Sequence, residues 1–189
     1  MKMSKKKKAE RGLTIAELLI VVAIMGVLMA VSAPIYNRHL EKARETYDIY
    51  TMRQAATAAI ELYYAGITDE RSAKAAGLLW NAADKEGSNA YGIYVPGSGR
   101  FLAMNSKSAK GMAYGKGTKI DGGTRYVLGN GRGAYVANVD YTKAFVMIAI
   151  YPMASNPHAD IYWKSDDGKY IGGQNAPNDP KYSIRIMLN

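Results

Sequence analysis

The chain has no cysteine and only two histidines, His39 and His158, among its 189 residues. The absence of cysteine excludes disulfides and thiolate chemistry, and two distant histidines leave little for a histidine-based metal site or catalytic triad. In segment 111–117 (GMAYGKG) the glycine spacing is one residue too short for a phosphate-binding loop, and no Ser or Thr follows the lysine. We therefore expect neither an enzyme nor a cofactor.

Basic residues are missing from the segment between Leu13 and Asn37, where Glu17 is the single acidic residue. The otherwise apolar run from Leu13 to Ala33 is long enough, at about 1.5 Å per residue, to cross the roughly 30 Å core of a bilayer. A carboxylate in hydrocarbon is costly unless a cation lies at the same depth. Because this segment supplies no cation, we expect the partner of Glu17 to be an amine from another chain.

The residues before the apolar run are strongly basic. Residues 1–12 contain six Lys or Arg and one Glu, and they end in Gly12. The string from Gly12 to Leu18 (GLTIAEL), followed by the apolar run, resembles the class III signal peptide of type IV pilins and their relatives. Those relatives are the pseudopilins of type II secretion and of DNA competence. The resemblance extends from Lys5 to about Tyr36, and no motif continues it further.

The resemblance implies that a prepilin peptidase removes the leader, residues 1–12, by cutting between Gly12 and Leu13, and methylates the new N-terminus. Leu13 occupies the position where the family most often has phenylalanine, a change that the family tolerates, and Ala16 replaces a larger aliphatic residue. Before assembly the basic leader would remain cytoplasmic by the positive-inside rule, and the remainder would face outward from a single membrane-spanning segment.

In filaments of this family, the glutamate of one subunit neutralises the N-terminal amine of its neighbour. The resemblance therefore implies an assembly role for Thr14 and Glu17, and a looser helix at Gly26 and Pro34. The implied partners are further pilin subunits in a helical filament, the membrane, the prepilin peptidase and the pilus assembly machinery. The extracellular fibre would serve adhesion, twitching motility or surface colonisation. Two alternatives remain open: a pseudopilin of a secretion or DNA-uptake system, and an anchored surface domain that never polymerises.

The apolar spacing continues beyond Pro34 and predicts one helix over residues 13–65, membrane-spanning over 13–33. Charged residues occupy much of the rest of its surface, namely Glu41, Lys42, Arg44, Glu45, Asp48 and Arg53. Gly66 is the predicted stop, and a second helix is predicted over 69–85 with Asp69 as its cap.

The remainder of the globular head, residues 66–189, alternates short β-branched and aromatic runs with turn residues. These runs predict strands at 91–95, 100–104, 124–128, 134–139, 143–151, 161–164 and 182–188. The run 143–151 is the most apolar and is expected to be central. The predicted fold class is α+β, a long helix packed on an antiparallel sheet, which the pilin resemblance also implies.

The formal net charge of +9 is concentrated in the leader and in residues 100–132. This second block has seven basic side chains against Asp121 alone. Three interpretations remain open: a solvated loop, a contact with the net acidic region 13–99 of a neighbouring subunit, or DNA capture with stacking on Phe101 and Tyr114. The residues that would contact a polyanion or a subunit are Arg100, Lys107, Lys110, Lys116 and Lys119.

Acidic residues also cluster late in the chain. Asp166 and Asp167, together with Asp179, could ligate calcium, as acidic loops do in some pseudopilins. They lack the alternating ligand spacing of an EF-hand loop, so turn formation is the competing interpretation.

The N-terminus of the mature protein distinguishes the interpretations of the leader. We expect N-terminal sequencing or mass spectrometry of protein isolated from cells to find a methylated Leu13. A chain that begins at Pro34 would indicate an ordinary secretory signal peptide cleaved after Ala33. A chain that begins at Met1 would indicate an uncleaved membrane anchor.

Overall fold

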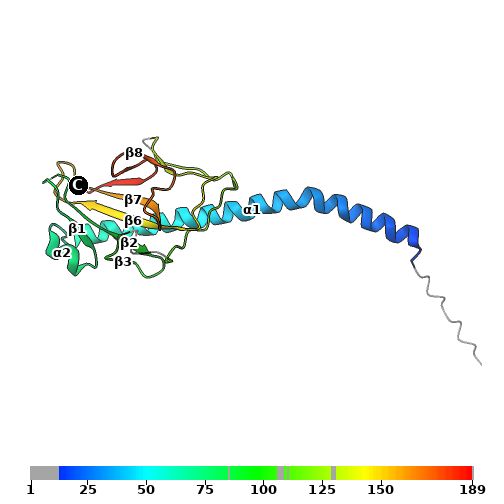
Figure 1. The fold of residues 1–189 in the computed structure, drawn as a ribbon, viewed down its shortest axis with the longest axis horizontal. Coiled ribbons are helices and arrows are strands. Elements are labelled where there is room, and N and C mark those ends of the chain that lie inside the picture. The colour runs from blue at the N-terminus through cyan, green and yellow to red at the C-terminus, as the bar shows by residue number, and fades with distance from the viewer. Residues whose placement is uncertain (1–12, 85, 106–108, 110, 129–130, 189) are drawn as a thin grey trace, which may run out of the picture. The chain divides into compact units, whose positions relative to one another are not determined.

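The computed structural model describes residues 13–84, 86–105, 109, 111–128 and 131–188. Contacts divide the chain into two compact units, Met1–Asn37 and Arg38–Asn189, and each is described by itself. The first unit contributes the beginning of one long helix. The second unit contains the rest of that helix and every other element (Figure 1).

The long helix, α1, runs from Ile15 to Tyr64 without interruption at Pro34. It ends where predicted: Gly66 has a positive φ of 96°, and its N–H donates a hydrogen bond to the carbonyl of Tyr63 at 2.9 Å. Glycine is favoured at this position because the left-handed conformation strains other residues.

The second unit is built on an antiparallel sheet with the strand order β1-β2-β6-β7-β10, and β3 pairs with β2 beside this path. The strands of this sheet are β1 Leu79–Asn81, β2 Asn89–Val95, β3 Arg100–Leu102, β6 Ala144–Tyr151, β7 His158–Ser165 and β10 Ile184–Met187. Two further pairs are separate: β4 Tyr126–Val127 with β5 Gly133–Tyr135, and β8 Gln174–Ala176 with β9 Asp179–Pro180. The predicted α+β class is confirmed, and β6 is central as expected.

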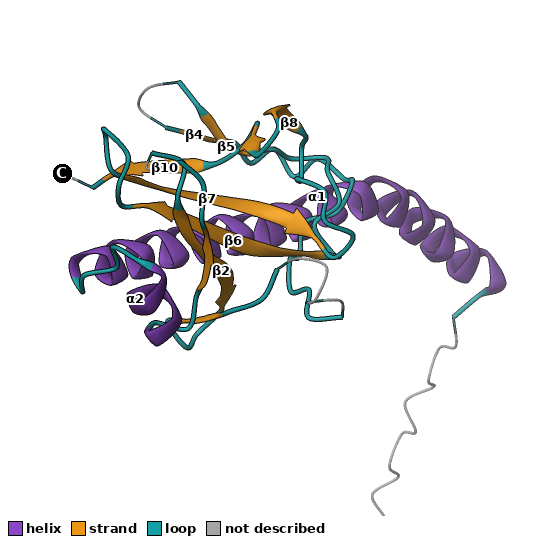
Figure 2. Cartoon of the chain, turned by 60° about the vertical axis from the view of Figure 1, so that its left-hand side comes forward, coloured by secondary structure: helices purple, strands orange, loops and turns teal. Residues whose placement is uncertain are grey.

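One face of the main sheet packs on the second half of α1 (Figure 2). Val146, Ile148 and Ile150 of β6 alternate along the strand and are fully buried in the same cluster as the helix residues. The helix contributes mainly small side chains there, such as Ala55 and Ala59, both fully buried. Val146, Ile148 and Ile150 share one face because a strand directs alternate side chains to the same side. The small alanine side chains of the helix then allow it to approach this face closely.

The predicted second helix over 69–85 is wrong beyond Ala75. The helix α2 spans only Glu70–Ala75, and Asp69 caps it as expected by accepting a hydrogen bond from the Ser72 N–H at 2.8 Å. Gly77 then adopts a positive φ of 77°, and the chain continues as β1 beside β2. Ladder pairing and burial of the following residues outweigh the helix propensity of an alanine-rich segment.

The observed strands agree with the predicted strands except in their ends and in three strands that were not predicted. All seven predicted runs contain a strand. The run 134–139 keeps only two residues in its strand, β5, whereas β7 begins three residues earlier than predicted. The short strands β8 and β9, like β1, were not predicted, because their sequences lack β-branched or aromatic alternation.

The fully buried Ile148 on the central strand is a test of this core. We expect Ile148→Ala to lower the free energy of unfolding by about 2–5 kcal/mol, because it removes buried methylene groups and leaves a cavity. Denaturant unfolding of the full chain in detergent measures this loss. Ile120→Ala, at a side chain that is 49% exposed, is the matched control and should change the value by less than about 0.5 kcal/mol. Equal losses at the two positions would contradict the core assignment.

Candidate functional site

The N-terminal part of α1 has an apolar surface that its own chain leaves uncovered. Every residue from Leu13 to Leu40 is exposed, including large side chains all around the helix such as Ile24 and Val31. Among the described residues, α1 is the one helix long and apolar enough to cross a membrane. A helix that is apolar on all sides requires lipid or other helices around it. This surface therefore requires cover from outside the chain.

Thr14 and Glu17 form a reciprocal cap at the start of α1. The Thr14 N–H and hydroxyl donate hydrogen bonds to Glu17 Oε2 at 2.8 and 2.9 Å, and the Glu17 N–H donates to Thr14 Oγ1 at 3.3 Å. This is a capping box, whose Thr-x-x-Glu signature is present in the sequence and was missed there. No ion pair joins Glu17 to a described cation. Glu17 thus caps its own helix and keeps its charge available for a partner.

The structure keeps α1 helical through both predicted weak points. Pro34 has no N–H, so the carbonyl of Ala30 lacks its usual intrahelical donor. A Cβ atom added at Gly26 would contact nothing within 4 Å, so no neighbour in this chain requires glycine there. Of the predicted processing site, Leu13 is 79% exposed and Gly12 lies outside the described residues.

Three acidic side chains on the second half of α1 are buried, although the sequence suggested a charged helix surface. Glu41, Glu45 and Asp48 lie on one face, one helical turn apart, and are no more than 1% exposed. Residues at three- and four-residue steps share a helix face. Buried carboxylates are costly unless hydrogen bonds satisfy them, so their partners identify what this face holds.

The partners are backbone N–H groups of the loop before β4. Glu45 accepts hydrogen bonds from the N–H groups of Gly122 and Thr124, each at 3.0 Å. Glu41 accepts one from the Thr118 N–H and forms an ion pair with Arg44 at 3.1 Å. A Cβ atom on Gly122 would lie 2.4 Å from the backbone nitrogen of Lys42, so only glycine permits this approach.

Asp48 completes the attachment of the loop. Its carboxylate accepts the Lys116 N–H at 2.9 Å, the Gly117 N–H at 2.8 Å and the Tyr135 hydroxyl at 3.1 Å. Burial nevertheless raises the pKa of Asp48 to about 6, against the opposing effect of these hydrogen bonds. Desolvation is the larger effect because the carboxylate is fully enclosed. The three acids together clamp residues 116–124 against α1.

This clamp was missed from the sequence, although a signal for it exists. The spacing of Glu41, Glu45 and Asp48 places three acids on one face of a helix that continues into buried residues such as Met52. The segment 115–123 contains four glycines, and glycine-rich backbone can present its N–H groups closely to a carboxylate. The three acids alone do not indicate the segment 115–123 as their partner, and the glycines of that segment do not indicate the acids.

The structure places the basic block in several different environments. Lys116 and Lys119 are exposed on the clamped loop, whereas Arg100 is exposed on β3. Lys107 and Lys110 lie outside the described residues. The other two cations of the block have acidic partners: Arg125 pairs with Asp121 at 3.0 Å, and Arg132 pairs with Asp179 at 3.4 Å. No described contact gathers the exposed cations into one site.

The acidic residues considered for calcium are not gathered either. Asp167 pairs with Lys169 at 2.7 Å, and Asp179 pairs with Arg132. Among the described residues, no group of three or more acidic or histidine side chains is arranged to hold a metal ion. Turn and ion-pair formation accounts for the described contacts of these residues.

Comparisons with known proteins agree with the N-terminal geometry. The family model described as "Prokaryotic N-terminal methylation motif" matches residues 7–33. Fimbrial protein Q of Moraxella bovis is 27% identical over 157 residues, which is 83% of this chain and 93% of that protein. Fimbrial protein EcpB of Eikenella corrodens is 39% identical over 49 residues, 26% of this chain and 31% of that protein. No solved structure matches the chain.

The methylation motif includes the first part of the capped, apolar and exposed helix α1. The N-terminal motif and the fimbrial relatives support the type IV pilin family in its broad sense, which includes the pseudopilins.

The raised pKa of Asp48 makes a prediction about pH. A folded-state pKa of about 6, above the unfolded value near 3.8, means that the folded protein binds the proton more tightly. Proton binding at Asp48 therefore adds to the free energy of unfolding below about pH 4, and this contribution is lost as the pH rises through about 6. Relative to Asp48→Asn, the wild type should lose on the order of 2–3 kcal/mol between about pH 4 and pH 7.

The measurement is chemical denaturation of both full chains in detergent across this pH range. Subtracting the variant removes the titration of the other carboxylates. If the wild type gains stability relative to Asp48→Asn as the pH rises, hydrogen bonding exceeds desolvation and the assigned direction is wrong.

Proposed function

We propose that this chain is the building subunit of a type IV pilus-like extracellular filament. The observation that carries the proposal is the apolar surface from Leu13 to Ala33, which is exposed on every side and contains a single carboxylate. Lipid covers such a surface before assembly, and parallel helices of other subunits cover it in a filament. The leader, residues 1–12, would be removed by a prepilin peptidase between Gly12 and Leu13.

Glu17 would set the register between subunits in that filament. Cleavage creates an α-amine on Leu13, directly before the capping residue Thr14. Glu17 Oε2 accepts both hydrogen bonds from Thr14, and no described cation pairs with the carboxylate. An amine from a neighbouring subunit at the same depth would neutralise the remaining charge, and only a limited set of axial positions brings the two together.

Gly26 and Pro34 would allow α1 to adapt when it packs among other helices. Pro34 already leaves one carbonyl without its helical donor, so local unwinding there loses fewer hydrogen bonds than elsewhere.

The clamp on Glu41, Glu45 and Asp48 belongs to the second unit and would hold the loop in place while the first unit packs. The exposed Lys116 and Lys119 of that loop would face acidic residues of a neighbour.

The pseudopilin alternative predicts the same helix and the same cleavage. Both curated relatives are named fimbrial proteins, which supports a surface fibre over a secretion or DNA-uptake pseudopilus. A fibre would serve adhesion, twitching motility or surface colonisation. Long fibres on the cell surface that are lost on deletion of the protein would support the pilus; secretion or DNA-uptake defects without such fibres would support the pseudopilin.

The test of the assembly role is Glu17→Gln. Glutamine can still accept the capping hydrogen bonds from Thr14, so the variant removes the charge and keeps the helix start. We expect normal helix content by circular dichroism, normal cleavage after Gly12, and absent or sharply reduced filaments by electron microscopy. Glu61→Gln, at an exposed carboxylate near the end of α1, is the matched control and should assemble normally. Normal filaments from Glu17→Gln would remove the assembly role.

A further inference from the structure

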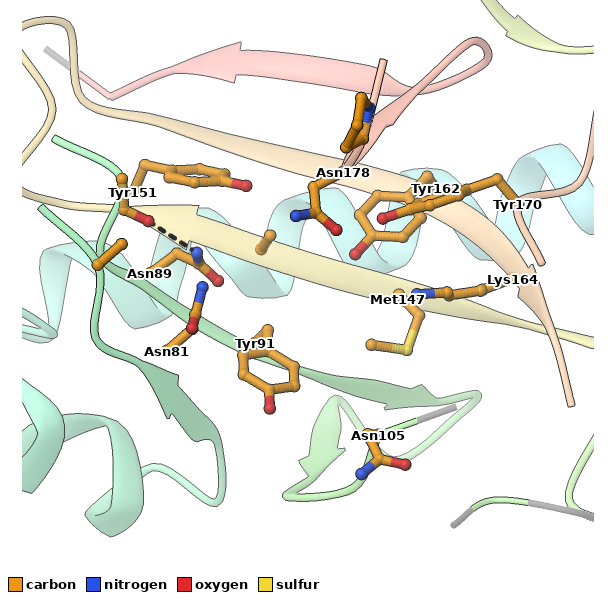
Figure 3. A pocket seen from close by; sticks show the side chains of 14 residues that line it. Asn81, Asn89, Tyr91, Asn105, Met147, Tyr151, Tyr162, Lys164, Tyr170 and Asn178 are labelled. Carbon is orange, nitrogen blue, oxygen red and sulfur yellow. Dashed lines mark hydrogen bonds between the residues drawn. The ribbon is translucent and has the colours of Figure 1, made fainter. Parts of the chain in front are cut away.

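The face of the main sheet opposite α1 contains a hollow of about 630 Å³ (Figure 3). Four tyrosines and four asparagines line it, together with one lysine and a few apolar residues. This volume lies within the roughly 300–1,000 Å³ that is typical of small-ligand sites. None of the lining residues is acidic.

The strand register explains why one side of the hollow presents amides next to an aromatic ring. Asn81 of β1 is paired with Asn89 of β2, so both side chains project from the same face. Tyr91 follows two residues later on that face and is paired with Ala149 of β6. Ala149 lines the hollow with only a methyl group, which leaves space between the larger side chains around it.

Aromatic side chains form the other side. Tyr162 of β7 lies beside Tyr170, with ring centroids 5.3 Å apart and planes inclined by 45°. Lys164 Nζ lies 4.5 Å from the centroid of the Tyr170 ring. Asn178 projects into the same space (Figure 3). The two sides therefore present ring faces and amide groups across the hollow.

Two tyrosine hydroxyls in the hollow, those of Tyr151 and Tyr162, stay protonated at neutral pH. Burial raises the pKa of Tyr151 to about 12 and that of Tyr162 well above its ordinary value. Neutral hydroxyls and amides can both donate and accept hydrogen bonds. Because the described residues that line it include one cation and no carboxylate, the hollow is suited to an uncharged ligand that has many hydroxyl groups.

We propose that this hollow is a binding site for a neutral saccharide, with the C–H face of a sugar ring on Tyr91 and its hydroxyls bonded to Asn81 and Asn89. Aromatic faces pack well against the apolar side of a pyranose ring, and side-chain amides match the donor and acceptor pattern of sugar hydroxyls. The Asn89 amide already donates a hydrogen bond to the Gly87 carbonyl at 3.0 Å, which fixes its orientation in the hollow. Among the described lining residues, a polyanion would meet Lys164 as the one cation.

This proposal names a ligand class for the proposed filament, but binding itself does not require assembly. The test is saturation-transfer NMR of the full chain in detergent micelles with two neutral probes, the N-acetylglucosamine trimer and cellotriose. A sulfated disaccharide of similar size is the charged comparison. We expect saturable binding of a neutral probe, with the strongest transfer to its ring C–H protons.

Three variants locate the binding. Tyr91→Ala and Asn81→Ala should each weaken the binding about tenfold or more, and Ala149→Leu should abolish it by filling the hollow without removing a ligand contact. Tyr50→Ala removes a tyrosine that is 58% exposed on α1 and is the matched control, with unchanged binding expected. Thermal unfolding of each variant shows whether the second unit remains folded.

Several outcomes would overturn the proposal. These are no transfer to either neutral probe at millimolar concentration, stronger binding of the sulfated disaccharide, or binding that Ala149→Leu leaves intact. Loss of filaments in Ala149→Leu, without any saccharide binding by the wild type, would instead make this face a subunit contact. Glu17→Gln should lose filaments and retain saccharide binding, so failure of the assembly role and failure of the saccharide site are distinguishable.

Discussion

The need to cover an apolar helix constrains the rest of this protein. From Ile15 to Ala33 the chain forms an apolar helix that none of the described residues buries. The hydrophobic effect makes that surface unstable in water, so it must lie in lipid or among other helices. A carboxylate at the start of the helix adds a second requirement, a cation at the same depth. Membrane insertion would satisfy the first requirement alone, whereas the proposed polymer of the same chain would satisfy both.

The second unit solves a different problem with the same helix. Small residues of α1 pack on the sheet, and three buried acids fasten the loop 116–124 by its backbone N–H groups. No cysteine is available to hold this loop, and hydrogen bonds to carboxylates are stronger than those to neutral acceptors. The clamp therefore performs the anchoring that a disulfide would provide. Its cost is the desolvation that raises the pKa of Asp48.

The two faces of the central strand have different uses. On the α1 side, β6 presents Val146, Ile148 and Ile150 to the core. On the other side, Met147 and Ala149 lie under a hollow with tyrosine and asparagine walls. The same strand thus supports the attachment of the helix and a concave polar surface, which separates the stability of the second unit from the chemistry that it presents outward.

The features that the sequence alone determined are those that depend on a continuous stretch of chain. The N-terminal methylation motif, the apolar run, the helix through Pro34 and the stop at Gly66 can each be recognised from neighbouring residues. The short strand-forming runs separated by turn residues after this helix indicated the α+β class and the central strand.

Tertiary structure decided the rest. The acids of α1 are buried because their donors lie about 70–80 residues further along the chain. The predicted second helix ends early because pairing with β2 competes with it. The hollow exists because register brings Asn81, Tyr91 and Ala149 to one face. Each of these depends on a partner that is distant in sequence, and local pattern holds no information about which distant segments will meet.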